Sequence, residues 1–570
     1  MRFGISIALV ALLGGCASVP QAPSYDTILR GGTVYDGSGS APFAGDIGIR
    51  GDRIAYVGPH LAGRGAREVD ARGLAVAPGF VNMLSWANEA LIADPKSQSD
   101  IRQGVTLEVM GEGESMGPWS DEMKRLETQR QGDLKFPIEW TSLGEYLSWL
   151  ERKGVSTNVA SFVGATTVRV HELGEGDVDP NPAQLARMRA LVREAMNEGA
   201  MGVGSSLIYA PAYFAETPEL VALAREAGSC GGMYISHIRD EGPKLLEAID
   251  ELVAISAQSG APAEIYHFKQ SGRPNWGKIG DAVARVEAAR ARGLRITADM
   301  YTYAASSTGL DAAMPLWIQA GGIEAWVKRL QDPVQRKRAL DEMRAGKVSE
   351  DSDLVIQEPA KVLLLGFKTE ALKGLTGKTL EEVARARGKS PEETAADLIV
   401  EDGTRIQVAY FAMSEENVKR EAALPWMSFG SDASSQAPEG VFLRSSTHPR
   451  AYGNFARVLG KYARDEKVMT LQEAVRRLAA LPADNLGIKD RGRLKAGSYA
   501  DVVLFDPRTI RDNATFAKPQ VYATGMRDVF VNGVQVLKNG AHTGATPGRF
   551  VKGPGAGRCP PLPFSPRGRG

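Results

Sequence analysis

Two short apolar runs, each ending in a histidine, constrain the fold of this chain most strongly. Residues 233–237 read Met-Tyr-Ile-Ser-His, and residues 263–267 read Ala-Glu-Ile-Tyr-His. Between them, residues 244–260 carry apolar side chains at helical spacing. A strand, a helix and a second strand within about thirty residues form a βαβ unit, whose two strands are parallel. We therefore expect His237 and His267 at the carboxyl ends of neighbouring strands, in a chain that has only six histidines.

Strand-like runs of this kind recur through the middle of the chain and alternate with helical patterns. They are residues 79–84, 105–111, 158–164, 199–206, 233–237, 264–267, 295–301 and 427–432. Eight βα units in one block predict an α/β fold of the TIM (β/α)8 barrel class rather than an open sheet. A further strand-like run at 407–413 does not fit this count. The charged, helical stretch near 313–363 is predicted to be an insertion after the seventh strand.

Both ends of the chain are expected to contribute to a second, smaller unit. Short alternating strands with glycine turns occupy residues 25–77 and 487–546. They predict a small β-sandwich domain formed by both terminal segments, which leaves residues 78–486 for the barrel. Residues 547–570 are rich in Pro, Gly and Arg and are predicted to be a disordered tail.

The first 24 residues have the form of an export signal and a tether. A charged start is followed by an apolar run at 3–13, too short to cross a bilayer, and then by Leu13-Gly14-Gly15-Cys16. This ending resembles the bacterial lipobox, which implies lipidation of Cys16. The resemblance implies an exported lipoprotein at the periplasmic face of the outer membrane, held there by this anchor only. An ordinary cleaved signal peptide is the alternative.

Charge and cysteine content exclude other classes of protein. The formal net charge is zero and the isoelectric point is near 7.0, so no nucleic-acid partner is expected. The three cysteines, Cys16, Cys230 and Cys559, are too few and too scattered to predict a disulfide framework or a cysteine-rich zinc site.

A carboxylate completes the candidate site. Asp432 ends the last strand-like run, at the same expected face as His237 and His267. Two imidazoles and a carboxylate can bind a zinc-like ion and leave a position for water, whose proton a nearby carboxylate can take. Each histidine taken alone could instead be a core or helix-capping residue.

Several stretches match a known family of enzymes. They are residues 76–80, 103–106, 207–211, 236–242, 267–269, 298–303, 430–432, 448–453 and 492–501. Through them the chain resembles the N-acyl-D-amino-acid deacylase (D-aminoacylase) branch of the amidohydrolase superfamily. The resemblance implies a metal-bearing barrel that hydrolyses an amide bond, other than a peptide bond, in an N-acyl amino acid or a similar small molecule.

The same resemblance implies roles for single residues. His237 and His267 correspond to metal ligands, and Asp432 corresponds to a ligand that also carries the catalytic proton. Tyr209, Lys269 and, as a candidate, Arg450 correspond to substrate-binding residues. The lysine and the arginine could instead form structural salt bridges.

Two departures from the family pattern affect the metal site. Leu84 and Trp86 stand where the family has a His-x-His pair, which argues against a two-metal centre. Gly113 takes the place of a zinc-binding cysteine, between Glu112 and Glu114. Carboxylate oxygen suits zinc, manganese or iron, so we expect Glu112, or as second choice Glu114, to replace the cysteine. Both carboxylates could instead face solvent at the rim.

The sequence thus predicts a metal-dependent amidohydrolase that deacylates N-acyl-D-amino acids or similar compounds. It would hold one divalent ion, with zinc favoured, and use Asp432 as general base. Two alternatives stay open: a ligand-binding pseudoenzyme on the same fold, and a cyclic-amide hydrolase of the hydantoinase or dihydroorotase type.

Overall fold

The structure, a computed structural model, describes residues 24–560. The predicted signal segment with Cys16 and the last ten residues, 561–570, lie outside the described residues. Within the described part of the chain, every helix is too short or too polar to cross a membrane.

Parallel strands form the centre of the molecule. One sheet contains β6 (Phe80–Asn82), β7 (Val105–Met110) and β8 (Asn158–Ser161). The other contains β9 (Val163–Gly164), β10 (Gly202–Ser206), β11 (Met233–His237), β12 (Ala263–Ile265), β13 (Ile296–Met300) and β17 (Met427–Phe429). Each of the eight predicted strand-like runs overlaps at least one of these strands. Residues of β7, β8, β10 and β11 are buried throughout, as expected where helices cover a parallel sheet.

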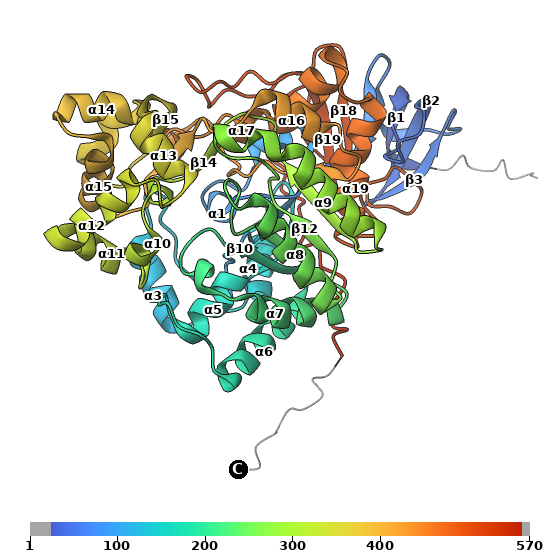
Figure 1. The fold of residues 1–570 in the computed structure, drawn as a ribbon. Helices are drawn as coiled ribbons and strands as arrows, with labels where there is room; N and C mark the ends of the chain where they lie inside the picture. The colour runs from blue at the N-terminus through green and yellow to red at the C-terminus, as the bar shows by residue number, and fades with distance from the viewer. Residues whose placement is uncertain (1–23, 561–570) are drawn as a thin grey trace, which may run out of the picture.

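The predicted βαβ unit is confirmed. Strand β11, helix α8 (Leu245–Ser259) and strand β12 follow one another, and the two strands pair in parallel with Ile235 opposite Glu264. Helices α7 (Thr217–Ser229) and α9 (Ile279–Ala291) pack on either side of α8 along the outside of the strands (Figure 1).

The remaining helices around the parallel strands occur before β13 and after β16. They are α1 (Ala90–Ala93), α2 (Gln98–Ile101), α3 (Asp121–Arg130), α4 (Leu143–Lys153), α5 (Ala165–Leu173), α6 (Pro182–Glu198), α16 (Glu415–Ala422), α17 (Arg450–Arg457), α18 (Leu471–Val475) and α19 (Leu481–Asn485).

The two parallel sheets meet at both of their ends. Strands β8 and β9 are consecutive, with only Phe162 between them. On the other side, the backbone N–H of Met83 donates to the carbonyl of Phe429 (3.3 Å) and that of Asp432 to the carbonyl of Leu84 (2.9 Å). The segment of β17, the last parallel strand, therefore lies beside that of β6, the first.

Strands from both chain ends form a third sheet. It joins β1 (Tyr25–Val34), β2 (Phe43–Arg50), β3 (Arg53–Gly58), β4 (Gly65–Asp70), β5 (Ala75–Pro78), β18 (Val502–Phe505), β19 (Met526–Val531), β20 (Val534–Lys538) and β21 (Ala541–His542). The two ends meet where β5 pairs with β18 antiparallel. The predicted sandwich implied two facing sheets, but these strands belong to one continuous hydrogen-bonded sheet with a shared core.

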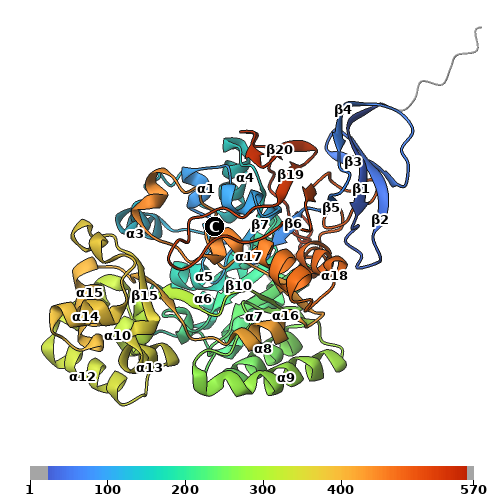
Figure 2. The ribbon, with the colours of Figure 1, turned by 90° about the horizontal axis from the view of Figure 1, so that it is seen from above.

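An inserted lobe stands on the opposite side of the parallel strands from β1–β4 (Figures 1 and 2). It contains an antiparallel sheet of β14 (Ser306–Gly309), β16 (Gln407–Tyr410) and β15 (Val362–Gly366), with β16 in the middle. Its helices are α10 (Leu316–Gln319), α11 (Ile323–Gln331), α12 (Pro333–Arg344), α13 (Glu350–Gln357), α14 (Leu380–Arg387) and α15 (Pro391–Asp402). The lobe has its own hydrophobic core.

The predicted bounds of the insertion, 313–363, are therefore too narrow. The lobe extends from β14 at residue 306 to the end of β16 at residue 410. The strand-like run at 407–413, which did not fit the count of eight, is the central strand of the lobe. The pairing of β14 with β16, about a hundred residues later, depends on contacts across the whole insertion, which local patterns do not show.

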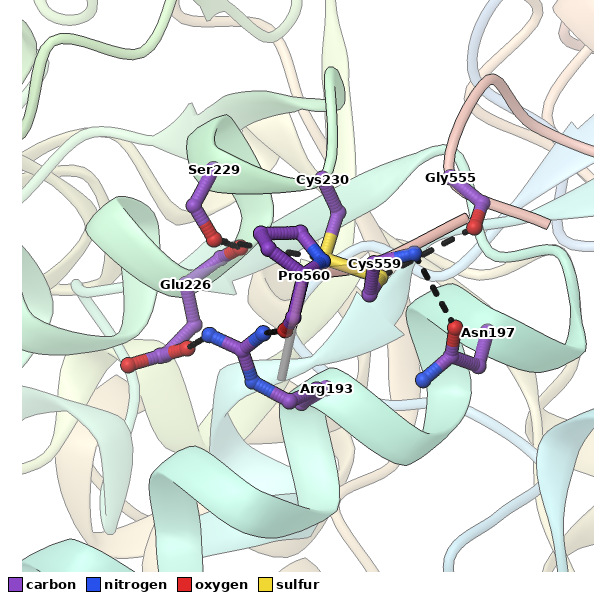
Figure 3. The surroundings of a disulfide bond; sticks show 8 residues. All are labelled: Arg193, Asn197, Glu226, Ser229, Cys230, Gly555, Cys559 and Pro560. Carbon is purple, nitrogen blue, oxygen red and sulfur yellow. Dashed lines mark hydrogen bonds and ion pairs between the residues drawn. A yellow bond between two sulfur atoms is a disulfide. The ribbon is translucent and has the colours of Figure 1, made fainter. Parts of the chain in front are cut away.

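The prediction of a disordered tail is wrong for residues 547–560. This segment crosses the amino-terminal side of the parallel strands, where Gly548 N–H donates to Val155 O (2.7 Å) and Gly553 N–H to Gly199 O (2.9 Å). A disulfide links Cys230, after α7, to Cys559 (Figure 3). The sequence did not predict this bond, because its two cysteines are 329 residues apart.

Candidate metal centre

The carboxyl ends of the parallel strands open into a cavity of about 720 Å³. Strand-end residues form one part of its wall, and the inserted lobe supplies others, among them Ser307, Lys368 and Arg405. This is the face at which enzymes with parallel βα units carry out their chemistry.

Three buried side chains converge at the strand ends. Glu112 Oε1 lies 3.1 Å from His237 Nδ1 and 2.9 Å from His267 Nε2. The exposed fraction of each of these three side chains is 6% or less. One possible ligand atom from each lies within 4.8 Å of the others. The structure thus brings together two predicted ligands and the first choice for the third.

Local backbone geometry places these groups. Glu112 lies between Gly111 (φ +102°) and Gly113 (φ +68°). A Cβ at Gly113 would be only 2.4 Å from the Ser206 Cβ, so a cysteine at this position would not fit the present turn. His267 itself has a φ of +34°, which is unusual for a residue with a side chain. Its backbone N–H donates to Asp299 Oδ1 (2.9 Å), which helps hold that conformation.

The donor set fits a divalent metal ion. Each ring turns one nitrogen toward Glu112 Oε1, so possible ligand atoms from all three side chains face one point. Two imidazoles and one carboxylate match the three protein ligands typical of catalytic zinc sites, which keep a further position open.

Burial and neighbouring charges shift the pKa values of all three groups. Burial opposes the charge on Glu112, but the neighbouring imidazoles outweigh it and hold the pKa of Glu112 below its usual range. Burial likewise lowers the pKa of His237. For His267 the carboxylates of Glu241 and Glu112 outweigh burial and raise its pKa to about 10. Positive charge is therefore stabilised between Glu112 and His267. A bound metal ion would displace the imidazole proton there.

Asp432 stands beside this group and not within it. Its Oδ2 lies 2.8 Å from Arg450 Nη1, and its Oδ1 accepts a hydrogen bond from Trp86 Nε1 (3.1 Å). The same indole N–H also contacts Glu112 Oε2 (3.0 Å). The sequence had predicted Asp432 as a metal ligand. In the structure it lies outside the group of possible ligands, which consists of Glu112, His237 and His267. Burial raises the pKa of Asp432, with Arg450 opposing that shift.

All three predicted substrate-binding residues line the cavity, but two of them are bonded to protein groups. Lys269 Nζ donates to Glu241 Oε1 (2.6 Å), and Arg450 pairs with Asp432. The Tyr209 ring packs edge-on against His237, with centroids 5.1 Å apart.

Glu114, the second choice of ligand, also lines the cavity but lies outside the group of three. Burial raises its pKa.

Three further residues at this site were not among the predicted site residues. The Glu241 carboxylate lies within 4 Å of a nitrogen atom of each of His237, His267 and Lys269. Trp86 joins Glu112 to Asp432 through its indole N–H. Arg405, from the inserted lobe, places its guanidinium 4.7 Å from the centre of the Tyr209 ring. Glu241 had a local signal in its position four residues after His237 in a family motif, and Trp86 had one in standing where the family has a histidine.

Comparison with known proteins shows which family the chain belongs to. The chain is 32% identical to the D-aminoacylase of Alcaligenes xylosoxydans xylosoxydans over 537 residues, which cover 94% of this chain and 99% of that protein. It is 31% identical to the N-acyl-D-glutamate deacylase of the same organism over 532 residues, covering 92% and 96%. The family model described as Amidohydrolase family matches residues 362–537.

Solved structures give the same result. A D-aminoacylase structure with a binuclear metal centre superposes with a TM-score of 0.77 at 31% identity, over 93% of this chain and all of that one. The N-acyl-D-glutamate deacylase from Bordetella bronchiseptica, complexed with zinc and a phosphonate inhibitor, gives 0.77 at 28% identity over 93% of this chain and 100% of that chain. The chain therefore belongs to the D-aminoacylase, or N-acyl-D-amino-acid deacylase, family of the amidohydrolases.

Proposed function

We propose that this protein is a metal-dependent amidohydrolase that removes the acyl group from N-acyl-D-amino acids or closely related compounds. The convergence of Glu112, His237 and His267 in a cavity at the strand ends carries this proposal. A pseudoenzyme would have no need for these three groups to meet. The near full-length similarity to deacylases favours this activity over hydrolysis of a cyclic amide.

We also propose that the two parallel sheets close into one eight-stranded TIM barrel. The continuity of β8 with β9 supports closure on one side, and the hydrogen bonds of Met83 and Asp432 support it on the other. Closure explains why Glu112 after β7, His237 at the end of β11 and His267 after β12 can point to one centre.

Glu112, His237 and His267 would hold one divalent ion, with zinc favoured. Such an ion, when bound, polarises a carbonyl group and lowers the pKa of a coordinated water molecule. Trp86 stands where related enzymes would need ligands for a second ion, and its indole N–H already engages Glu112 and Asp432. We therefore propose a centre for a single ion.

The protein groups around this centre can carry the proton transfers. Asp432 would accept a proton from the attacking water and return it to the leaving nitrogen. Arg450 and Trp86 hold its two oxygens in place. Tyr209 would contact the substrate from the cavity wall. Lys269 and Arg450 would contact a substrate carboxylate while keeping, or sharing, their present protein partners.

We further propose that the protein is exported and anchored through a lipid on Cys16. The sequence before Cys16 supports this, and so does the disulfide between Cys230 and Cys559. Such bonds persist mainly in oxidising compartments outside the cytosol.

The activity can be tested with zinc-loaded protein and three kinds of substrate: N-acetyl-D-amino acids, their L enantiomers and a hydantoin. We expect hydrolysis of the D compounds, which His237→Ala abolishes. His171→Ala, at a partly exposed histidine of α5, is the matched control and should stay active. Absence of turnover with all three kinds of substrate would favour the pseudoenzyme, and turnover of the hydantoin alone would favour the cyclic-amide hydrolase.

A further inference from the structure

A second carboxylate lies behind both histidines. Glu241 follows β11 in the loop that leads to α8, and its side chain is 9% exposed. Its Oε1 lies 3.0 Å from His267 Nδ1, and its Oε2 lies 3.6 Å from His237 Nε2. Glu112 faces the other nitrogen of each ring. Each imidazole is therefore enclosed between two carboxylates.

We propose that Glu241 is a positioning residue, which orients both imidazoles so that their Glu112-facing nitrogens are presented to a metal ion. This inference rests on the metal centre of the proposed function and adds the group that sets its geometry. A neutral imidazole carries one proton, and metal-binding histidines usually donate that proton to a carboxylate or a carbonyl.

The two histidines are held to different degrees. At 3.0 Å, Glu241 Oε1 can accept the Nδ1–H of His267, which leaves the lone pair of Nε2 on the side of Glu112. At 3.6 Å, the contact with His237 Nε2 is longer than a hydrogen bond. A small rotation of that ring, once its other nitrogen binds an ion, would complete the second contact.

Lys269 fits this arrangement as the partner of Glu241. Its Nζ lies 2.8 Å from His267 Nδ1, but it cannot donate to that nitrogen when the nitrogen carries a proton. Its bond to Glu241 Oε1 (2.6 Å) has no such conflict, and the exposed fraction of the lysine side chain is 3%. Lys269 thus balances the buried negative charge of Glu241, a role additional to the substrate contact predicted from the sequence.

The backbone around Glu241 is fixed as a positioning role requires. The Glu241 carbonyl accepts a hydrogen bond from Ser271 N–H (2.8 Å), which ties the loop after β11 to the loop after β12. Asp240 Oδ1 accepts from the backbone N–H groups of Gly242 (2.9 Å) and Lys244 (2.8 Å). The carboxylate is therefore presented by a loop whose own hydrogen bonds are satisfied.

Glu251 offers a matched control in the same βαβ unit. It lies on α8, its side chain is 15% exposed, and it pairs with Arg239 Nε at 2.9 Å. It is thus a largely buried carboxylate in an ion pair, but its recorded partners do not include His237 or His267. A loss caused only by breaking a buried ion pair would appear in Glu251→Gln as well.

The test measures zinc affinity of the full chain by competition with a chromophoric chelator, for wild type, Glu241→Gln and Glu251→Gln. Glu241→Gln keeps the size of the side chain but removes its charge and one acceptor. We expect it to weaken zinc binding about 10- to 100-fold, as is typical when such a supporting carboxylate is removed, and Glu251→Gln to change it less than about 2-fold. Thermal unfolding of the metal-free proteins checks that both variants fold.

Zinc affinity of Glu241→Gln within about 2-fold of wild type would overturn the inference and leave the proposed function standing. An equal loss in Glu251→Gln would also overturn it, because the effect would then be structural. A wild-type chain that binds no zinc would overturn both proposals. If Glu241→Gln does not fold, Glu241→Asp is measured in its place. The aspartate keeps the negative charge, but its shorter side chain withdraws the carboxylate from both histidines. Zinc affinity of Glu241→Asp equal to that of wild type would contradict the inference.

Discussion

One buried carboxyl group should make the stability of this protein fall as the pH rises. Glu421 lies on α16 with an exposed fraction of 1%. Neither oxygen of its side chain has a hydrogen-bond partner among the described residues. Burial raises the pKa of Glu421 to about 8, from an ordinary value of 4.5. The folded protein therefore binds this proton more tightly than the unfolded chain does.

The sign and the size of the effect follow from that difference. Below pH 4.5 the group is protonated in both states and costs nothing. Between pH 4.5 and about 8 the unfolded chain releases the proton while the folded protein keeps it, so the free energy of unfolding decreases. At about 1.4 kcal/mol for each pKa unit the full difference is about 5 kcal/mol. Structural relaxation and entry of water lower such costs, so we expect a loss of about 2–5 kcal/mol.

Glu421→Gln removes the ionisable group and should flatten this dependence. The assay is urea unfolding of wild type and variant at pH 5, 6.5 and 8, with a metal chelator present so that the metal ligands contribute equally. Glu416→Gln, at an exposed position on the same helix, is the control and should behave as wild type. A difference in unfolding free energy between Glu421→Gln and wild type that does not change with pH would refute the reasoning.

Three further changes test contacts around the site and the fold. Trp86→Phe removes the N–H that Glu112 and Asp432 share, and since Trp86 is 36% exposed, water can replace part of the lost hydrogen bonding. We expect a cost of about 1–2 kcal/mol, seen as a kcat/KM lower by about 5- to 30-fold. An unchanged kcat/KM would contradict this role of the indole. Arg450→Met leaves the buried Asp432 carboxylate without its counter-charge and should lower kcat/KM at least about 100-fold, so activity near wild type would contradict the pairing. Cys559→Ser should lower the unfolding free energy by about 2–4 kcal/mol and make it insensitive to reductant, whereas equal sensitivity of variant and wild type would argue against the disulfide.

Much of the central fold could be predicted because its signals are local. Parallel strands buried on both faces read as short apolar runs, and the helix between β11 and β12 shows in the spacing of its apolar residues. Parallel strands place their ends together, so His237 and His267 could be paired from the sequence. Glu112 could be chosen because it lies beside the position of a missing ligand.

Other features depend on contacts between distant segments and gave no local signal. The inserted lobe was underestimated because β14 pairs with a strand that follows about a hundred residues later. The disulfide to Cys559 depends on the path of the last segment across the molecule. Lys269 was assigned to the substrate, since only the three-dimensional structure shows that Glu241 already binds it.

The central claim is that Glu112, His237 and His267 hold a single metal ion, and the metal content of the purified chain tests it most directly. Elemental analysis measures this content for wild type, Glu112→Gln and Glu114→Gln after equilibration with zinc and removal of the free ion. The account predicts one zinc ion per chain in wild type and in Glu114→Gln, since Glu114 lies outside the group of three. It predicts a large loss of zinc in Glu112→Gln, whose amide oxygen is a weaker ligand than the carboxylate. A full zinc complement in Glu112→Gln, or two ions or none in wild type, would contradict it.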